Sequence, residues 1–208
     1  MSLRKFNLPA YPTVHFSDKI WVHCPNCHDA ALVTFNLPKY SFPVPSGLGS
    51  TCVCSSCGFQ QKNNDKWNGY VQGFINRSCG FCGNRVIHST KPTKTCSKTL
   101  KATCNTCTKE REYETTWYRY RVNKPNDPYF GYNLWLQTTV KSNILWLYNL
   151  QHLNYLRTYV EAKLREDDSR HKYSMITNLP QWIKSSKNRD IILKKLDKLE
   201  NKLKRNAR

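Results

Sequence analysis

The stretch Cys24-Pro-Asn-Cys27 is the first of four Cys-x-x-Cys pairs, and Cys54-Ser-Ser-Cys57, Cys79-Gly-Phe-Cys82 and Cys104-Asn-Thr-Cys107 follow it. A two-residue spacer lets one tight turn present two sulfur atoms to one ion, and zinc prefers four thiolates in a tetrahedron. Twenty-six residues separate the first pair from the second and twenty-one separate the third from the fourth, which suits hairpins. The sequence therefore predicts two Zn²⁺ per chain, held by Cys24, Cys27, Cys54 and Cys57 and by Cys79, Cys82, Cys104 and Cys107.

An internal repeat favours this sequential pairing of the cysteines. Residues 24–30 correspond to residues 79–85, and residues 54–59 correspond to residues 104–109. A crossed arrangement, first pair with third and second with fourth, stays open, and so does an iron–sulfur cluster with the same ligands. A thioredoxin-like redox pair would need a strand-to-helix context that the four pairs lack.

Several other residues lie close to the four pairs. Four cysteines suffice for each ion, so we expect His23, His28 and Cys52 not to bind metal. Cys96 lies in an alternating segment and is expected to be a small packed residue. His88 is expected to be a surface residue of the second hairpin.

The motifs exclude most kinds of catalysis. A catalytic zinc site keeps one position open for water, whereas each of these sites is closed by four sulfurs. The deaminase signature, Gly-rich phosphate loops, nucleophile elbows and paired-carboxylate motifs are absent from the sequence. We therefore expect the protein not to be an enzyme and to have no small-molecule substrate.

The chain is strongly basic, with 33 Lys and Arg against 14 Asp and Glu in 208 residues, a net charge of +19. Such an excess attracts polyanions, so nucleic acid is the first expected partner and an acidic protein surface is the second. Residues 1–58 carry only +2 of this charge, so the later regions are expected to contact the polyanion. With neither a secretory signal nor a membrane span in the sequence, we expect a cytoplasmic protein with no membrane partner and with reduced cysteines.

The expected fold is α+β, with two tandem zinc ribbons followed by a β-hairpin and a small helical region. The expected divisions are an N-terminal extension (1–20), ribbon 1 (21–76), ribbon 2 (77–122), a linker (123–128) and the C-terminal domain (129–208). Strand-like stretches, Trp67–Ile75 and Tyr113–Val122, follow the second pair of each ribbon.

The C-terminal domain has hairpin and helix patterns. Leu134–Val140 and Ile144–Tyr148 predict a hairpin around residues 141–143, and Asn149 is suited to cap the next helix. That helix has an apolar stripe and is expected to end at Glu166–Ser169; the stripe is Leu150, Leu153, Leu156, Val160 and Leu164. A helical turn is expected at Ser174–Leu179. A last helix, beginning near Asn188, has its own stripe, expected to pack on the first helix: Ile192, Leu196, Leu199 and Leu203.

Four segments resemble a family of bacterial zinc-ribbon-containing proteins over residues 129–203, with the cysteine pairs consistent upstream. The segments are Leu134-Trp-Leu-Gln137, Leu145-Trp-Leu-Tyr-Asn149 with His152-Leu153, Tyr159-Val-Glu-Ala-Lys-Leu-Arg165 and Leu179-Pro-Gln-Trp-Ile-Lys-Ser-Ser-Lys-Asn-Arg189. The resemblance implies a shared architecture. It supplies neither an activity nor a list of site residues.

The segment from Trp182 to Arg189 is the predicted nucleic-acid site. Lys184, Lys187 and Arg189 supply charge next to a helix N-terminus, where phosphate can bind, and Trp182 can stack on a base. The alternative is a capped turn between helices with a buried Trp182. The favoured function is non-catalytic binding of DNA or RNA. The rival is a protein-interaction module, such as an antitoxin, an immunity factor or an accessory subunit of a phage-defence complex.

Overall fold

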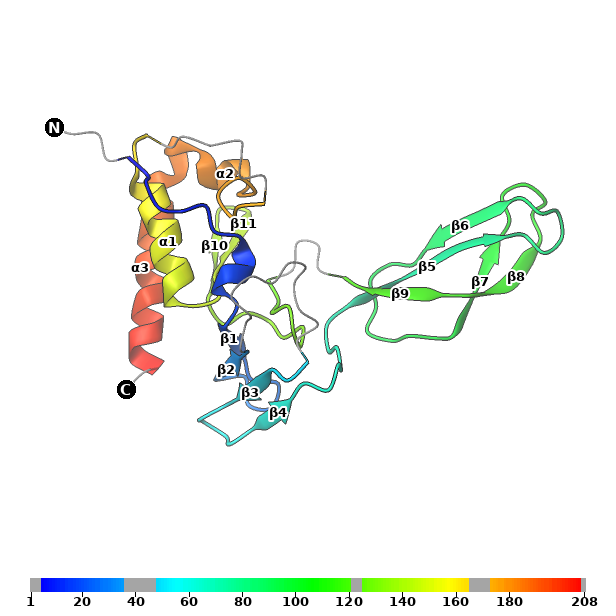
Figure 1. Cartoon of the computed structure of the whole chain (residues 1–208), viewed down its shortest axis with the longest axis horizontal. Helices are drawn as coiled ribbons and strands as arrows, with labels where there is room; N and C mark the ends of the chain where they lie inside the picture. The colour runs from blue at the N-terminus through cyan, green and yellow to red at the C-terminus, as the bar shows by residue number, and fades with distance from the viewer. Residues whose placement is uncertain (1–4, 36–47, 121–124, 165–172, 207–208) are drawn as a thin grey trace.

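The computed structural model describes residues 5–35, 48–120, 125–164 and 173–206. It consists of a wide body and a narrow arm that extends away from the body (Figure 1). We define the arm as residues 71–119 and the body as the remaining described residues. Small antiparallel sheets occur in both parts and the α-helices lie in the body, so the fold is α+β as predicted.

The body contains a four-stranded antiparallel sheet and a separate hairpin. The strands of the sheet pair in chain order and are β1 (Lys19–His23), β2 (Ala30–Thr34), β3 (Thr51–Val53) and β4 (Gln60–Lys62). Alternate residues of β1, Ile20 and Val22, point into the core and are fully buried. The hairpin joins β10 (Gln137–Val140) to β11 (Asn143–Trp146) and confirms the hairpin prediction.

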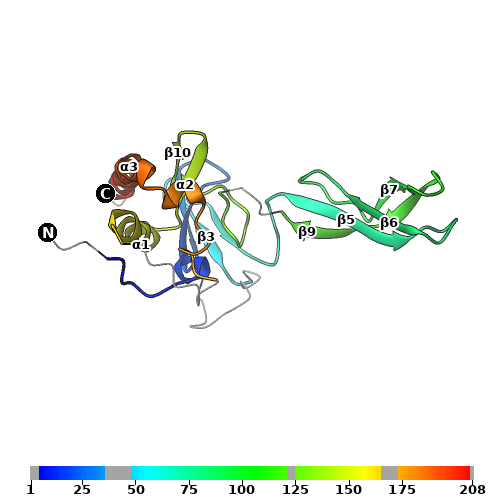
Figure 2. The same ribbon diagram turned by 90° about the horizontal axis from the view of Figure 1, so that it is seen from above.

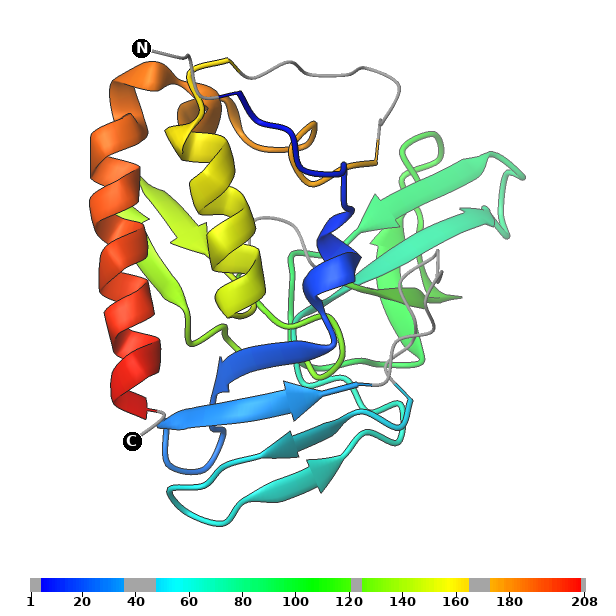
Figure 3. The same ribbon diagram turned by 60° about the vertical axis from the view of Figure 1, so that its left-hand side comes forward.

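The helices of the body are α1 (Leu150–Glu161), α2 (Gln181–Lys184) and α3 (Arg189–Asn206), with short 3₁₀ turns η1 (Thr13–Phe16) and η2 (Ser186–Asn188). Asn149 caps α1 as predicted, since its side chain accepts a hydrogen bond from the His152 N–H at 2.9 Å. Helix α3 begins one residue after the predicted Asn188. It lies beside α1 (Figure 3), and Ile192, Leu196 and Leu199 are buried.

The inner face of α1 differs from the predicted stripe. Leu150 and Leu164 are 46 % and 44 % exposed, whereas His152, Tyr155 and Tyr159 are buried. Leu164 lies beyond the end of the helix at Glu161. In the first turn of the helix, the His152 side chain faces the core and Leu150 does not. The predicted end at residues 166–169 lies outside the described residues. The predicted helical turn at residues 174–179 consists of hydrogen-bonded turns without a helix.

The predicted N-terminal extension is part of the body's core. Phe6 packs edge-on against Tyr155 and Tyr159 with ring centroids 5.6 and 5.5 Å away, and Phe16 is buried. Buried residues from two stretches of the chain, Phe16 to Cys54 and Tyr129 to Leu199, form a single hydrophobic core. The first cysteine unit and the C-terminal region therefore form one body rather than separate modules.

The arm contains two small sheets. Its strands are β5 (Val71–Ser78), β6 (Arg85–Ser89), β7 (Thr99–Thr103), β8 (Glu110–Glu114) and β9 (Thr116–Arg119). The central strand β5 crosses the boundary expected after residue 76 and pairs with β6 and β9, so it belongs with the second cysteine unit. The residues 121 and 122 of the predicted last strand lie outside the described residues. The arm has its own small core around Ile75 and Val86. Figure 2 shows its strands extending away from the body.

A side-chain contact and a close approach of two glycines lie where the arm joins the body. Arg119, at the end of the arm, donates a hydrogen bond to Asp65 at 2.8 Å. Gly131 has a φ of 80°, and a Cβ at Gly131 would lie 2.5 Å from the Gly69 nitrogen. The lack of a Cβ at Gly131 therefore allows the segment just before the arm to pack closely against this residue.

The predicted linker includes a buried carboxylate. Residues 123 and 124 lie outside the described part of the chain, but Asp127 is fully buried. Its carboxylate accepts hydrogen bonds from the backbone N–H groups of Tyr129, Phe130 and Tyr132, at 2.9, 2.7 and 2.6 Å. Residues 125–128 are thus packed into the body rather than forming a linker between two domains.

Candidate metal centres

The structure gathers the eight paired cysteines into two clusters of four. Cys24, Cys27, Cys54 and Cys57 form the first, and Cys79, Cys82, Cys104 and Cys107 form the second. Within each cluster the sulfur atoms lie within 4.8 Å of one another. This arrangement confirms sequential pairing, and each cluster could hold one metal ion.

The sulfur–sulfur distances test whether a tetrahedral ion fits. They are 3.7 Å for Cys24–Cys57, 3.6 Å for Cys27–Cys54 and 3.7 Å for both Cys79–Cys107 and Cys82–Cys104. A tetrahedron with metal–sulfur bonds of about 2.3 Å has sulfurs about 3.8 Å apart. The clusters therefore fit a single ion. A cluster of several iron atoms would need its cysteine sulfurs farther apart.

All four cysteine turns share one backbone pattern. The carbonyl of the first cysteine accepts a hydrogen bond from the residue four positions later, namely His28, Gly58, Gly83 or Thr108. Each of these residues has a positive φ, between 58° and 75°. The same turn thus presents two sulfurs at each of the four positions, as the repeat in the sequence indicates.

Hydrogen bonds to sulfur favour the metal-binding thiolate form. The Asn26 side-chain amide donates to Cys57 Sγ at 3.5 Å and lowers the pKa of this cysteine to about 6. The Phe81 N–H lies 3.5 Å from Cys79 Sγ and lowers the pKa of Cys79 to about 6. Each cluster therefore has at least one sulfur that is readily deprotonated near neutral pH, while the pKa of a neighbouring cysteine, Cys27 or Cys107, is raised.

The flanking residues take no part in the clusters. Cys52 is buried within β3, and burial raises the pKa of its thiol to about 12. His23 is held by a hydrogen bond between Nδ1 and the His28 carbonyl at 2.9 Å. His88 is exposed on β6 as expected, but Cys96 is exposed rather than packed, because its segment runs along the arm without forming a strand.

The four residues of the predicted nucleic-acid segment do not share one exposed surface. Lys184 Nζ donates to the Thr177 carbonyl at 2.8 Å, and Arg189 Nη2 donates to the Ala162 carbonyl at 3.0 Å. Trp182 is half-buried against the core, and Lys187 is exposed. Two of the three cations thus bind backbone carbonyls of their own chain, which favours a structural role for them. The capped turn with a buried Trp182 is not seen either, since neither α2 nor η2 has a side-chain cap.

No protein-family model, curated protein or solved structure matches the chain. The resemblance to bacterial zinc-ribbon-containing proteins therefore stays a prediction. Among the described residues, no helix has the length and apolar character needed to cross a bilayer.

Two features escaped the sequence analysis. One is an open face of the arm sheet with Phe74 and Tyr118, and the other is a cavity in the body beside His152. Gln72, Phe74 and Asn76 alternate along one strand, so their side chains share one face. The sequence does not show which residues of the neighbouring strands lie beside them, because that depends on strand pairing. The cavity combines residues distant in sequence and has no local signal.

Proposed function

We propose that the protein binds single-stranded nucleic acid through the arm, without catalysis, and that each cysteine cluster holds a structural Zn²⁺ in a zinc ribbon. Four thiolates leave an ion no open position for water or substrate, so the metal supports the fold. The observation that carries the proposal is an open sheet face with aromatic side chains in a strongly basic part of the chain.

The open face follows from the strand register. Tyr118 lies opposite Gln72, and Phe74 lies opposite both Thr116 and Ser89. Directly opposed side chains of antiparallel strands point to the same face. The opposite face of the sheet carries the buried Ile75 and Val86. Tyr118 and Phe74 therefore point away from the core of the arm.

This face offers flat rings to a ligand. Tyr118 is 59 % exposed and forms a surface groove together with Gln72, Phe74 and Ser89. Stacking of bases on aromatic side chains is worth about 1–3 kcal/mol per base, and unpaired strands are the form in which bases are free to stack. The exposed Ile87 on the same face adds apolar surface.

The charge of the arm complements a phosphate backbone. Residues 71–119 include nine Lys and Arg and three Glu, all nine of the cations at least partly exposed. Lys91, Lys98 and Lys101 are exposed and no side-chain hydrogen bond or ion pair involves them within the described residues. Their charges are therefore available to a polyanion.

Fluorescence anisotropy with single-stranded DNA, single-stranded RNA and duplex DNA tests this proposal. We expect single strands to bind more tightly than duplex and Tyr118→Ala to weaken binding about tenfold, the loss of one stacking contact. Combined replacement of Lys91, Lys98 and Lys101 by Ala is expected to lower the salt slope by up to about three.

Matched variants of the body serve as controls. Tyr173→Ala removes another exposed tyrosine, and Ala at Lys187, Lys194 and Lys198 removes three exposed lysines. If the body triple variant alone lowered affinity, the C-terminal part of the body, residues 187–198, would be the contact instead. Failure of the wild-type protein to bind any nucleic acid at low salt would leave an acidic protein partner as the function to test.

A further inference from the structure

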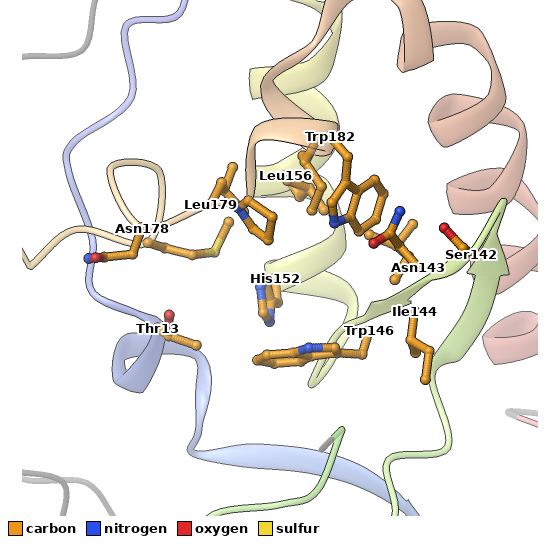
Figure 4. A pocket seen from close by; sticks show the side chains of 14 residues that line it. Thr13, Ser142, Asn143, Ile144, Trp146, His152, Leu156, Asn178, Leu179 and Trp182 are labelled. Atoms are coloured by element: carbon orange, nitrogen blue, oxygen red, sulfur yellow. The ribbon is translucent and has the colours of Figure 1, made fainter. Parts of the chain in front are cut away.

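A cavity of about 440 Å³ lies in the body between the hairpin β10–β11, α1 and α2. This volume is within the usual range for small-ligand pockets. Figure 4 shows Trp182 and Trp146 on different sides of the cavity, with His152 pointing into it. Asn143 and Met175 also line the cavity.

His152 supplies a buried donor to this cavity. The side chain is 3 % exposed, and Nδ1 accepts a hydrogen bond from the Tyr148 N–H at 3.2 Å. A backbone N–H only donates, so Nδ1 carries no hydrogen and the neutral ring has its hydrogen on Nε2. Within the described residues this Nε2–H has no hydrogen-bond partner. Because His152 lines the cavity, this N–H can donate to an acceptor placed there.

The ring is fixed in position before any ligand arrives. It stacks on Phe16 with centroids 5.0 Å apart and meets Trp146 at a right angle with centroids 5.9 Å apart. The helix cap from Asn149 to the His152 N–H holds the backbone at the same point. The donor is therefore pre-organised.

The cavity is suited to an uncharged molecule. No Asp, Glu, Lys or Arg is among the described residues that line it. Burial lowers the pKa of His152 to about 3, so the imidazole is neutral at physiological pH. An ionic ligand would lose its hydration without gaining a countercharge.

We propose that this cavity binds an uncharged aromatic heterocycle of nucleobase size, with a ring nitrogen or carbonyl oxygen accepting from His152 Nε2–H. The indoles of Trp146 and Trp182 give flat apolar walls, and the Asn143 amide offers both a donor and an acceptor. Such a combination matches the edge of a nucleobase. This site is on the body, apart from the arm face, and does not depend on the proposed function.

Titration of the full-length, zinc-loaded protein with adenosine, guanosine, cytidine and uridine tests the proposal. We expect saturable binding of at least one nucleoside, by calorimetry and by a change in tryptophan fluorescence. His152→Phe, which keeps a flat ring but removes the donor, is expected to weaken binding about tenfold. Trp182→Ala should weaken it by a similar factor because one wall is lost.

Trp135→Phe is the matched control, since Trp135 is an indole of the body that does not line the cavity. It should leave affinity unchanged, and circular dichroism and zinc content establish that each variant is folded. The proposal is overturned if no nucleoside binds at millimolar concentration, or if the folded His152→Phe and Trp182→Ala variants both bind as the wild type does.

Competition with a single-stranded oligonucleotide distinguishes two sources of the base. If the oligonucleotide displaces the bound nucleoside from the wild type but not from Trp182→Ala, one of its own bases occupies the cavity. If the oligonucleotide binds the arm without displacing the nucleoside, the ligand of the cavity is a free nucleoside. Nucleoside binding in a protein that binds no strand would support the cavity and contradict the proposed function.

Discussion

His28 and Thr108 occupy the same position in two different cysteine turns, and both have a positive φ, 67° and 58°. Gly58 and Gly83 hold this position in the other two turns, with φ values of 71° and 75°. The turn itself requires this conformation, because the N–H of this residue donates to the carbonyl of the first cysteine. A side chain with a Cβ is strained there.

Thr108→Gly is therefore expected to stabilise the metal-loaded arm by about 1 kcal/mol, and His28→Gly to have a smaller effect of the same sign. A threonine at positive φ is the more strained of the two because it is β-branched. The converse changes, Gly58→Ala and Gly83→Ala, are expected to destabilise by about 1 kcal/mol, although no atom would contact the new methyl group. Urea unfolding measures each change, and a less stable Thr108→Gly would contradict the argument.

Each chain is expected to contain two zinc ions. Cys54→Ser or Cys104→Ser should lower zinc content to about one, because each removes one of four ligands from a single cluster. Cys52→Ala and Cys96→Ser should each leave two ions, since neither sulfur belongs to a cluster. Elemental analysis gives the answer, and iron in place of zinc would disprove the metal assignment.

Removal of the Asp127 carboxylate should destabilise the body. Asp127→Ala leaves three backbone N–H donors without their buried acceptor, and we expect a loss of about 3 kcal/mol or more in the free energy of unfolding. Asp190→Ala, at an exposed position of α3, is the control and should change stability by less than about 0.5 kcal/mol. Equal unfolding midpoints for the two variants would show that the Asp127 contacts contribute nothing.

Stability should fall on acidification because of His152. Its pKa is about 3 in the folded protein, well below the ordinary value of 6.5. Between these values the unfolded chain therefore binds a proton that the folded chain does not. The His152 contribution is complete above pH 6.5 and declines by up to about 1.4 kcal/mol per pH unit below it. The free energy of unfolding of the wild type and of His152→Leu is measured between pH 5 and pH 6.5. The difference between the two slopes belongs to His152, because both proteins lose metal to acid in the same way. Parallel curves would mean that His152 is accessible to protons.

The sequence predicts local features of this fold well. Cysteine spacing predicts both clusters, and Asn149 predicts the start of α1. The hairpin between residues 137 and 146 follows from two apolar runs around a short polar turn. Each of these depends on residues close together in the chain or on an exact repeat.

Long-range packing explains where the sequence analysis differs from the structure. Trp67–Ile75 reads as a strand of the first unit, but the observed strand is Val71–Ser78. Its pairing with β6 and β9 is decided by tertiary structure. Lys184 and Arg189 read as exposed cations, but carbonyls from Thr177 and Ala162 lie within reach of their side chains. Phe6 has no local signal for packing on α1. These contacts join segments whose proximity only the folded chain creates.

The position of the arm within the chain sets an order of events during synthesis. The arm is inserted between the two halves of the body's core, and its sheets pair only strands from Val71 to Arg119. On a translating ribosome it can therefore close its own cysteine cluster soon after it emerges. Strand β1 must wait for the later half of the body, since Val22 bridges Leu134 and the Trp21 N–H donates to the Tyr148 carbonyl. The body, which contains the first cluster, is thus completed last although its first strand is made first.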